Sequence, residues 1–185
     1  MFRFDGMMIA AAALVGIAGA TARADEKLAP TVDYFVGESK TTSPDGKPIR
    51  TTLSLVKRVV TPADNRIEEE VLSVTANGPA RLFVTILEVN GNKYTVTEKS
   101  KAFEGEGELI GEPWKWKEWK SVTKLPGGAG TVTSEDKLTD RGMSAKKTFA
   151  GADGTIIFKF EDSLTRISPA TYDILHAKLA PAEKK

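Results

Sequence analysis

Three tryptophans close together form the most distinctive chemical feature of this sequence. Trp114, Trp116 and Trp119 are interleaved with lysines in the segment from Gly111 to Lys120. On an extended strand the first two would share one face and the third would lie on the other, unless a bulge shifts the register. An indole ring has a large rigid apolar face and one N–H donor, which suits a wall for an apolar ligand or a stacking surface for a sugar. The alternative is that two of these rings plug the core, which is the commoner role of aromatic stripes.

Acid–base or metal chemistry has few candidate residues. His176 is the only histidine and the chain has no cysteine, so it could supply one general base or one axial haem ligand but no multi-ligand metal site. Any nucleophilic triad would have to include it. Asp136 and Asp140, with Ser134 and Thr139, could bind a cation through oxygen atoms, although their spacing matches no established metal-binding loop. We therefore assign no catalytic residue, no metal ligand and no cofactor.

The composition excludes several classes of protein. The chain of 185 residues fits one domain, and its 26 Lys and Arg balance 25 Asp and Glu. A basic field typical of nucleic-acid binders is therefore absent, and no nucleic-acid partner is expected despite the lysines around the tryptophans. The lack of cysteine excludes a disulfide framework, zinc–thiolate and iron–sulfur sites, and lipid attachment through cysteine.

The N-terminus predicts export. Residues 1–24 have a basic start at Arg3, an uncharged run over 7–20, and small residues at Ala22 and Ala24, as in a secretory signal peptide. Cleavage is expected before Asp25. The uncharged run is shorter than the roughly 20 residues that a bilayer requires, so no membrane span is expected after cleavage. These features predict a periplasmic or secreted protein.

The rest of the chain is a series of short strands. Runs rich in Val, Ile, Thr, Phe and Tyr are separated by turn signals such as Pro44-Asp45-Gly46 and Asn90-Gly91-Asn92. Two glycines, at 105 and 107, suggest a bulged or sharply bent strand. Segment 169–179 is either a short helix capped by Ser168 and Pro169 or the closing strand. The strand candidates cover 31–39, 49–60, 66–76, 80–89, 93–99, 103–110, 113–124, 130–138, 143–149 and 155–161.

This spacing predicts an all-β fold, an antiparallel up-and-down β-barrel of about nine or ten strands in a single domain over 25–180. Residues 181–185 are expected to form a solvated tail. Several strands carry charge on both faces, as in Ile67-Glu68-Glu69-Glu70. A barrel of the outer-membrane type needs an apolar outer face on every strand, so we expect a different kind of barrel.

The region from Gly107 to Ile167, about a third of the chain, carries a set of turn and aromatic motifs. These are Gly105-x-Gly107, Gly111-x-Pro113-Trp114-x-Trp116-x-x-Trp119, Ser134-Glu135-Asp136-x-Leu138-Thr139-x-x-Gly142 and Phe149-x-Gly151-x-Asp153-Gly154. In these motifs the chain resembles an uncharacterised exported bacterial family with a calycin-like β-barrel, that is, one like lipocalins and fatty-acid-binding proteins. The resemblance implies a barrel with an interior cavity and supplies no catalytic residue.

Export, all-β patterning and abundant aromatic side chains together predict a β-barrel that binds a small apolar or amphipathic ligand in its interior. An alternative is an envelope structural or interaction protein with a packed core and no ligand. A third hypothesis, which we favour least, is an enzyme that uses His176 or a buried carboxylate as a base. Neither the ligand nor the oligomeric state follows from the sequence. The predicted ligand-binding residues are Phe83, Tyr94, Trp114, Trp116, Phe158 and Phe160.

Overall fold

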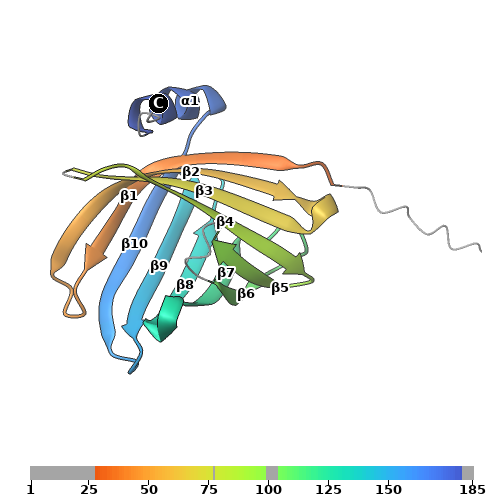
Figure 1. The fold of residues 1–185 in the computed structure, drawn as a ribbon. Helices are drawn as coiled ribbons and strands as arrows, with labels where there is room; N and C mark the ends of the chain where they lie inside the picture. The colour runs from red at the N-terminus through yellow and green to blue at the C-terminus, as the bar shows by residue number, and fades with distance from the viewer. Residues whose placement is uncertain (1–27, 77, 99–103, 181–185) are drawn as a thin grey trace, which may run out of the picture.

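The computed structural model describes residues 28–76, 78–98 and 104–180, which form a ten-stranded antiparallel barrel and one short helix (Figure 1). The predicted signal peptide and the predicted tail lie outside the described residues. The strands are β1 (Thr31–Thr42), β2 (Pro48–Thr61), β3 (Arg66–Thr75), β4 (Arg81–Asn90), β5 (Lys93–Glu98), β6 (Glu104–Ile110), β7 (Glu118–Lys124), β8 (Gly130–Leu138), β9 (Gly142–Gly151) and β10 (Ile156–Arg166). The two 3-10 turns are η1 (Pro62–Asp64) and η2 (Pro126–Gly128), and the helix is α1 (Pro169–Leu179).

Each strand pairs with its neighbours in the sequence, and β1 pairs with β10 to close the barrel. This confirms the predicted up-and-down topology. The tight connection at Asn90-Gly91-Asn92 is also confirmed, since β4 and β5 pair directly on either side of it. Closure pairs the edges of the first and last strands, so the sheet has no free edge along this seam.

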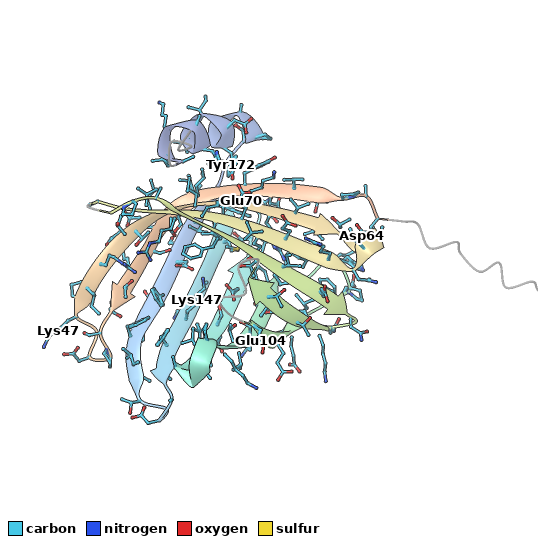
Figure 2. The ribbon with its side chains drawn as sticks, in the orientation of Figure 1. Lys47, Asp64, Glu70, Glu104, Lys147 and Tyr172 are labelled. Carbon is cyan, nitrogen blue, oxygen red and sulfur yellow. The ribbon has the colours of Figure 1, made fainter. Side chains whose placement is uncertain are left out.

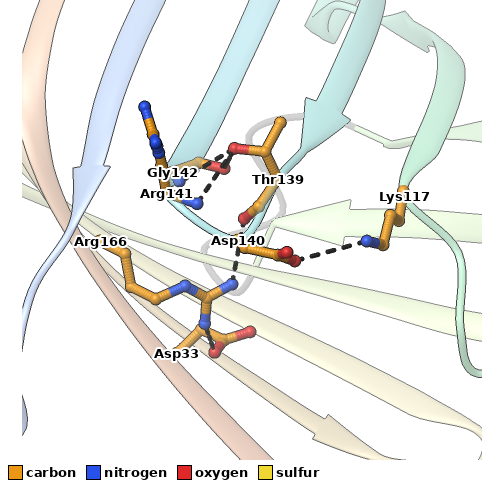
Figure 3. Close-up of polar contacts among 7 residues, drawn as sticks. All are labelled: Asp33, Lys117, Thr139, Asp140, Arg141, Gly142 and Arg166. Carbon is orange, nitrogen blue, oxygen red and sulfur yellow. Dashed lines mark hydrogen bonds and ion pairs between the residues drawn. The ribbon is translucent and has the colours of Figure 1, made fainter.

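Polar contacts hold the seam at the end of the barrel where β1 begins and β10 ends (Figure 3). Arg166 forms an ion pair with Asp33 across β1 and β10, and its Nη2 donates to the backbone oxygen of Thr139 at 3.4 Å. The guanidinium also lies over the ring of Phe35, with its central carbon 5.1 Å from the centroid. Nearby, Lys117 Nζ lies 3.4 Å from Asp140 Oδ1. The seam therefore joins three segments that are far apart in the sequence.

The glycines of β6 were predicted to mark a bulge or a sharp bend. The register of β6 against β5 and β7 shows no shift, so the first of these alternatives, the bulge, is wrong. Instead, a Cβ atom added at Gly107 would lie 2.3 Å from both the Tyr94 ring and the backbone oxygen of Lys120. Glycine is needed here because the tyrosine ring crosses directly over the strand.

The tryptophan segment is also not one continuous strand. β7 begins only at Glu118, and the residues before it form a loop in which Trp114 has a φ of 63°. A residue in the left-handed region cannot continue a strand, so the predicted alternation of the three rings does not apply. The rings of Trp114 and Trp116 instead pack against each other, with centroids 5.0 Å apart.

Segment 169–179 is a helix, which resolves the ambiguity left by its sequence. The side chain of Ser168 accepts a hydrogen bond from the Thr171 N–H, as expected of an N-cap. α1 lies outside the barrel, over β1, β2 and β3, where Tyr172 packs on Leu55 and Leu72 (Figure 1). Within the described residues, no helix has the length and apolar character needed to cross a membrane.

The apolar core fills only part of the barrel. The largest buried cluster lies toward the end that carries η1 and the tryptophan loop, and we call it the plug. Figure 2 places Asp64 at this end of the barrel and Lys47 at the opposite end, which we call the mouth. The buried residues of the plug are Ile67, Leu87, Val89, Tyr94, Val96, Leu109, Trp116 and Trp119.

Candidate functional site

A cavity of about 470 Å³ occupies the barrel interior between the plug and the mouth, and it is partly open to solvent. The cavity is lined by inward-facing residues of strands on both sides of the β1–β10 pairing that closes the barrel. One part of its wall is apolar and consists of Val56, Val71, Phe83, Met143, Phe160 and Leu164. The side of the cavity formed by β1, β2 and β3 carries hydroxyl groups from Ser39, Thr41, Thr52, Ser54, Ser73 and Thr75. The charged lining residues are Arg50, Arg81, Glu69, Asp136, Lys147 and Asp162.

A smaller space of about 230 Å³ lies closer to the plug and is lined in part by Tyr94 and Trp119. It shares Glu69, Asp136 and Lys147 with the larger cavity. These three charged residues therefore stand between the two spaces, at the floor of the larger cavity.

The charged side chains at this floor are arranged as pairs. Lys147 Nζ lies 2.7 Å from Asp162 Oδ2, across β9 and β10. Arg58 Nε lies 3.0 Å from Glu69 Oε1 in an ion pair that is not aligned as a hydrogen bond. The same guanidinium lies over the Trp119 ring, with its central carbon 4.6 Å from the centroid. Each of these two cations thus has one carboxylate partner.

Asp136 differs from the other carboxylates at the floor. It is 8% exposed and accepts a hydrogen bond from Ser134 Oγ, and no Lys or Arg among the described residues lies within ion-pair distance. Burial raises the pKa of Asp136 to about 6, against the opposing effects of Lys147 and the Ser134 hydrogen bond. The negative charges of Glu69 and Asp162 act in the same direction as burial. Asp136 is therefore a buried carboxyl group that changes protonation near neutral pH.

Lys147 stays charged although it is partly withdrawn from solvent. Burial alone would lower the pKa of Lys147, but the carboxylates of Asp162 and Asp136 outweigh that effect and raise it. Tyr94 is held neutral, because burial raises the pKa of its phenol far above the usual range. Within the ranges that the structure describes, the acidic residues and His176 form no group of three suited to hold a metal ion. The floor thus contains a network of carboxylates and cations.

The six predicted ligand-binding residues separate into two groups. Phe83 and Phe160 line the cavity, and Phe158 packs beside Phe160 with ring centroids 5.0 Å apart. Tyr94 and Trp116 are buried in the plug, and Trp114 packs against it. Trp116 Nε1 donates to Asn92 Oδ1 at 3.2 Å, which satisfies its one polar atom. The alternative that the tryptophans fill the core is therefore confirmed for Trp116.

The charged floor was not predicted, although the sequence contains a signal for it. Glu69 falls between Ile67 and Val71 on one face of β3, and Asp136 precedes Leu138 on one face of β8. A carboxylate on the same strand face as apolar residues points toward the interior of a barrel. In the triplet Glu68-Glu69-Glu70, which carries charge on both faces of the strand, the middle member lines the interior cavity.

Two other candidate sites are not formed. Asp140 is exposed on the turn after β8 and pairs with Lys117, so it does not join Asp136 in a cation site. His176 lies on α1 outside the barrel, stacked on Tyr172 with ring centroids 5.6 Å apart, and its Nε2 is 3.8 Å from Glu70 Oε1. The hypothesis of His176 as a base inside the barrel is therefore wrong, because the helix that carries it packs on the outer face.

No protein-family model and no curated protein matches this chain. A solved structure, the dehydratase domain from the CurK module of Curacin polyketide synthase, aligns over 78% of each chain at 8% identity with a TM-score of 0.21. A TM-score this low carries no argument about fold or function, so the function must be argued from the cavity itself.

Proposed function

We propose that this protein is an exported, calycin-like β-barrel that binds a small amphipathic ligand in its interior cavity. The observation that carries the proposal is the space of about 470 Å³ between the plug and the mouth. Cavities that hold small molecules are typically about 300–1,000 Å³ and combine apolar walls with a few convergent polar groups. The cavity in this barrel has both features.

The distribution of side chains favours an amphipathic ligand over a purely apolar one. Phe83 and Phe160 offer an apolar surface, whereas Ser39 and Ser54 contribute hydroxyl groups whose oxygens lie 3.1 Å apart. Polar groups that lose water without gaining a partner destabilise a complex. A ligand with both an apolar part and a polar part would satisfy this lining better than a hydrocarbon.

Export is part of the same proposal and rests on the first 24 residues. A signal peptide followed by a cysteine-free domain suits a protein that reaches the periplasm or the medium. Fractionation of cells that express the full chain, with N-terminal sequencing of the product, tests this part. A mature protein that begins at Asp25 outside the cytoplasm is expected. Full-length protein retained in the cytoplasm would contradict it.

Ligand binding is tested by native mass spectrometry of the protein purified from its exported form, followed by solvent extraction of any bound molecule. We expect an added mass that is lost in Ser73→Trp, because the indole would occupy the cavity. Ser144→Trp is the matched control, since Ser144 is exposed on the outer face of β9.

A bare mass, together with no binding of added amphiphiles, would favour the alternative of a structural protein. Circular dichroism of both variants is needed alongside, because loss of ligand is informative only if the Ser73→Trp barrel remains folded.

A further inference from the structure

We infer that the interior cavity selects a ligand whose polar end is a protonated amine, and that Asp136 is the residue that receives it. This inference rests on the proposed function and specifies the chemical class of the ligand. It is drawn from two neighbouring features: a buried carboxyl group that has no cation partner among the described residues, and a cavity large enough to admit a ligand with a cationic group.

The first step is the balance of charge at the floor. Three carboxylates line the cavity there, from Glu69, Asp136 and Asp162, but only one lysine does, Lys147. Lys147 pairs with Asp162, and Arg58 pairs with Glu69 from the side of the plug. Asp136 is left without a cation among the described residues. A cation that entered the cavity would therefore meet a carboxyl group that has no ion-pair partner among the described residues.

The second step is access. Asp136 belongs to the lining of both interior spaces, so a group that enters either of them can reach its carboxyl. Ser134 supplies the one side-chain hydrogen bond that Asp136 receives among the described residues. An ammonium group has three donors and no acceptor, which suits a site of carboxylates and hydroxyl oxygens. Charge-assisted hydrogen bonds of this kind are also stronger away from bulk water.

The third step concerns the opposite charge. A ligand with a carboxylate end would meet three acidic side chains at the floor, where like charges repel. Two arginines that line the cavity, Arg50 and Arg81, form no ion pair with the described residues and are exposed near the mouth. An anionic group would therefore stay near the mouth, while a cationic group would be drawn to the floor.

The dependence of binding on pH follows from the groups that face Asp136. These are Ser134 on its own strand, Glu69 on β3, Lys147 on β9, Asp162 on β10 and Tyr94 on β5. Because the pKa of Asp136 is about 6, its carboxyl is ionised at pH 7.5 and mostly protonated at pH 5. Amine binding should therefore weaken as the pH falls through this window, whereas the binding of a neutral ligand should not change.

Three probes of equal chain length test the inference by isothermal titration calorimetry: octylamine, octanol and octanoate. At pH 7.5 we expect octylamine to bind roughly ten- to a hundredfold more tightly than octanol, which is the range for one hydrogen bond to a charged group. Asp136→Asn should abolish this preference. Glu135→Gln removes the same charge from the outer face of β8, where Glu135 pairs with Lys120, and should leave the preference intact.

Equal affinity for octylamine and octanol in the wild-type protein, or an amine preference that survives Asp136→Asn, would overturn the inference and leave the proposed function standing. Tighter binding of octanoate would assign the polar end of the ligand to the arginines instead. If none of the three probes binds, both the inference and the proposed function fail. The wild-type protein measured at pH 7.5 and pH 5 provides the same test if Asp136→Asn does not fold.

Discussion

Replacing Asp136 by Asn should stabilise the folded barrel at neutral pH. The carboxyl is 8% exposed and its pKa is raised to about 6, mainly by burial, so its ionised form is disfavoured in the fold. Asparagine keeps the shape of the side chain and an oxygen that can accept the hydrogen bond from Ser134. It removes only the buried negative charge.

The size of the effect follows from the two pKa values. The unfolded chain loses the Asp136 proton near 3.8, whereas the folded protein keeps it until about 6. The native state thus binds more protons in this interval, and its free energy of unfolding decreases as the pH rises from about 4 to about 6. At about 1.36 kcal/mol per pH unit, the 2.2 units between 3.8 and 6 correspond to about 3 kcal/mol at pH 7. Asp136→Asn has no carboxyl group to ionise at this position, so its free energy of unfolding does not decrease in this way.

Urea denaturation at a series of pH values between 4 and 7 measures the difference directly. The wild-type and variant proteins should have similar free energies of unfolding near pH 4, and the variant should be more stable by about 3 kcal/mol at pH 7. Glu135→Gln serves as the control, because Glu135 is exposed and its pKa is lowered by the hydrogen bond and the charge of Lys120. This control should gain no stability at pH 7. A variant that is less stable than the wild type at pH 7, or a difference that does not change with pH, would refute the reasoning.

Three further substitutions test the packing around the cavity by thermal denaturation. Trp116→Ala removes a buried ring of the plug and its hydrogen bond to Asn92, and should cost about 3–5 kcal/mol. Gly107→Ala should destabilise by about 1–3 kcal/mol or more, because the added methyl group would overlap the Tyr94 ring. Ser168→Ala removes the N-cap of α1 and should cost about 1 kcal/mol while leaving the near-ultraviolet signal of the plug unchanged. Unchanged melting temperatures in the first two variants would contradict the packing described for the plug.

The charged floor is costly to the fold, which favours a functional role for it. Burying ions requires desolvation, and a buried ion pair is often no more stable than apolar residues of the same volume. One such pair, Arg58 with Glu69, and the partly buried pair of Lys147 with Asp162 lie beside Asp136 in this barrel. Other inward residues of the same strands, such as Val56, Val71 and Leu164, are apolar, so an apolar floor would be compatible with this architecture. The proposed ligand gives a reason for the charges.

Local sequence patterns were sufficient to predict the architecture. A two-residue alternation, turn signals at short intervals and the absence of a long helical period lead to an antiparallel meander, and ten strands of this kind close on themselves. Turn chemistry at Asn90-Gly91-Asn92 depends on residues close in the sequence, which is why it could be identified there, whereas the cap at Ser168 was one of two alternatives for segment 169–179. The pattern also showed that Glu69 and Val71 share a strand face.

The site depended on contacts that local patterns do not contain. Whether Trp116 fills a core or lines a cavity is decided by where the loop before β7 folds over the barrel end. Similarly, the pKa of Asp136 results from burial together with Lys147, Glu69 and Asp162, which come from three other strands. Alternation along one strand tells which side chains point inward, but the stagger between strands determines the depth at which they meet. The sequence by itself therefore determined an antiparallel barrel, and only the tertiary structure decided that charged side chains from separate strands form a floor beneath a cavity.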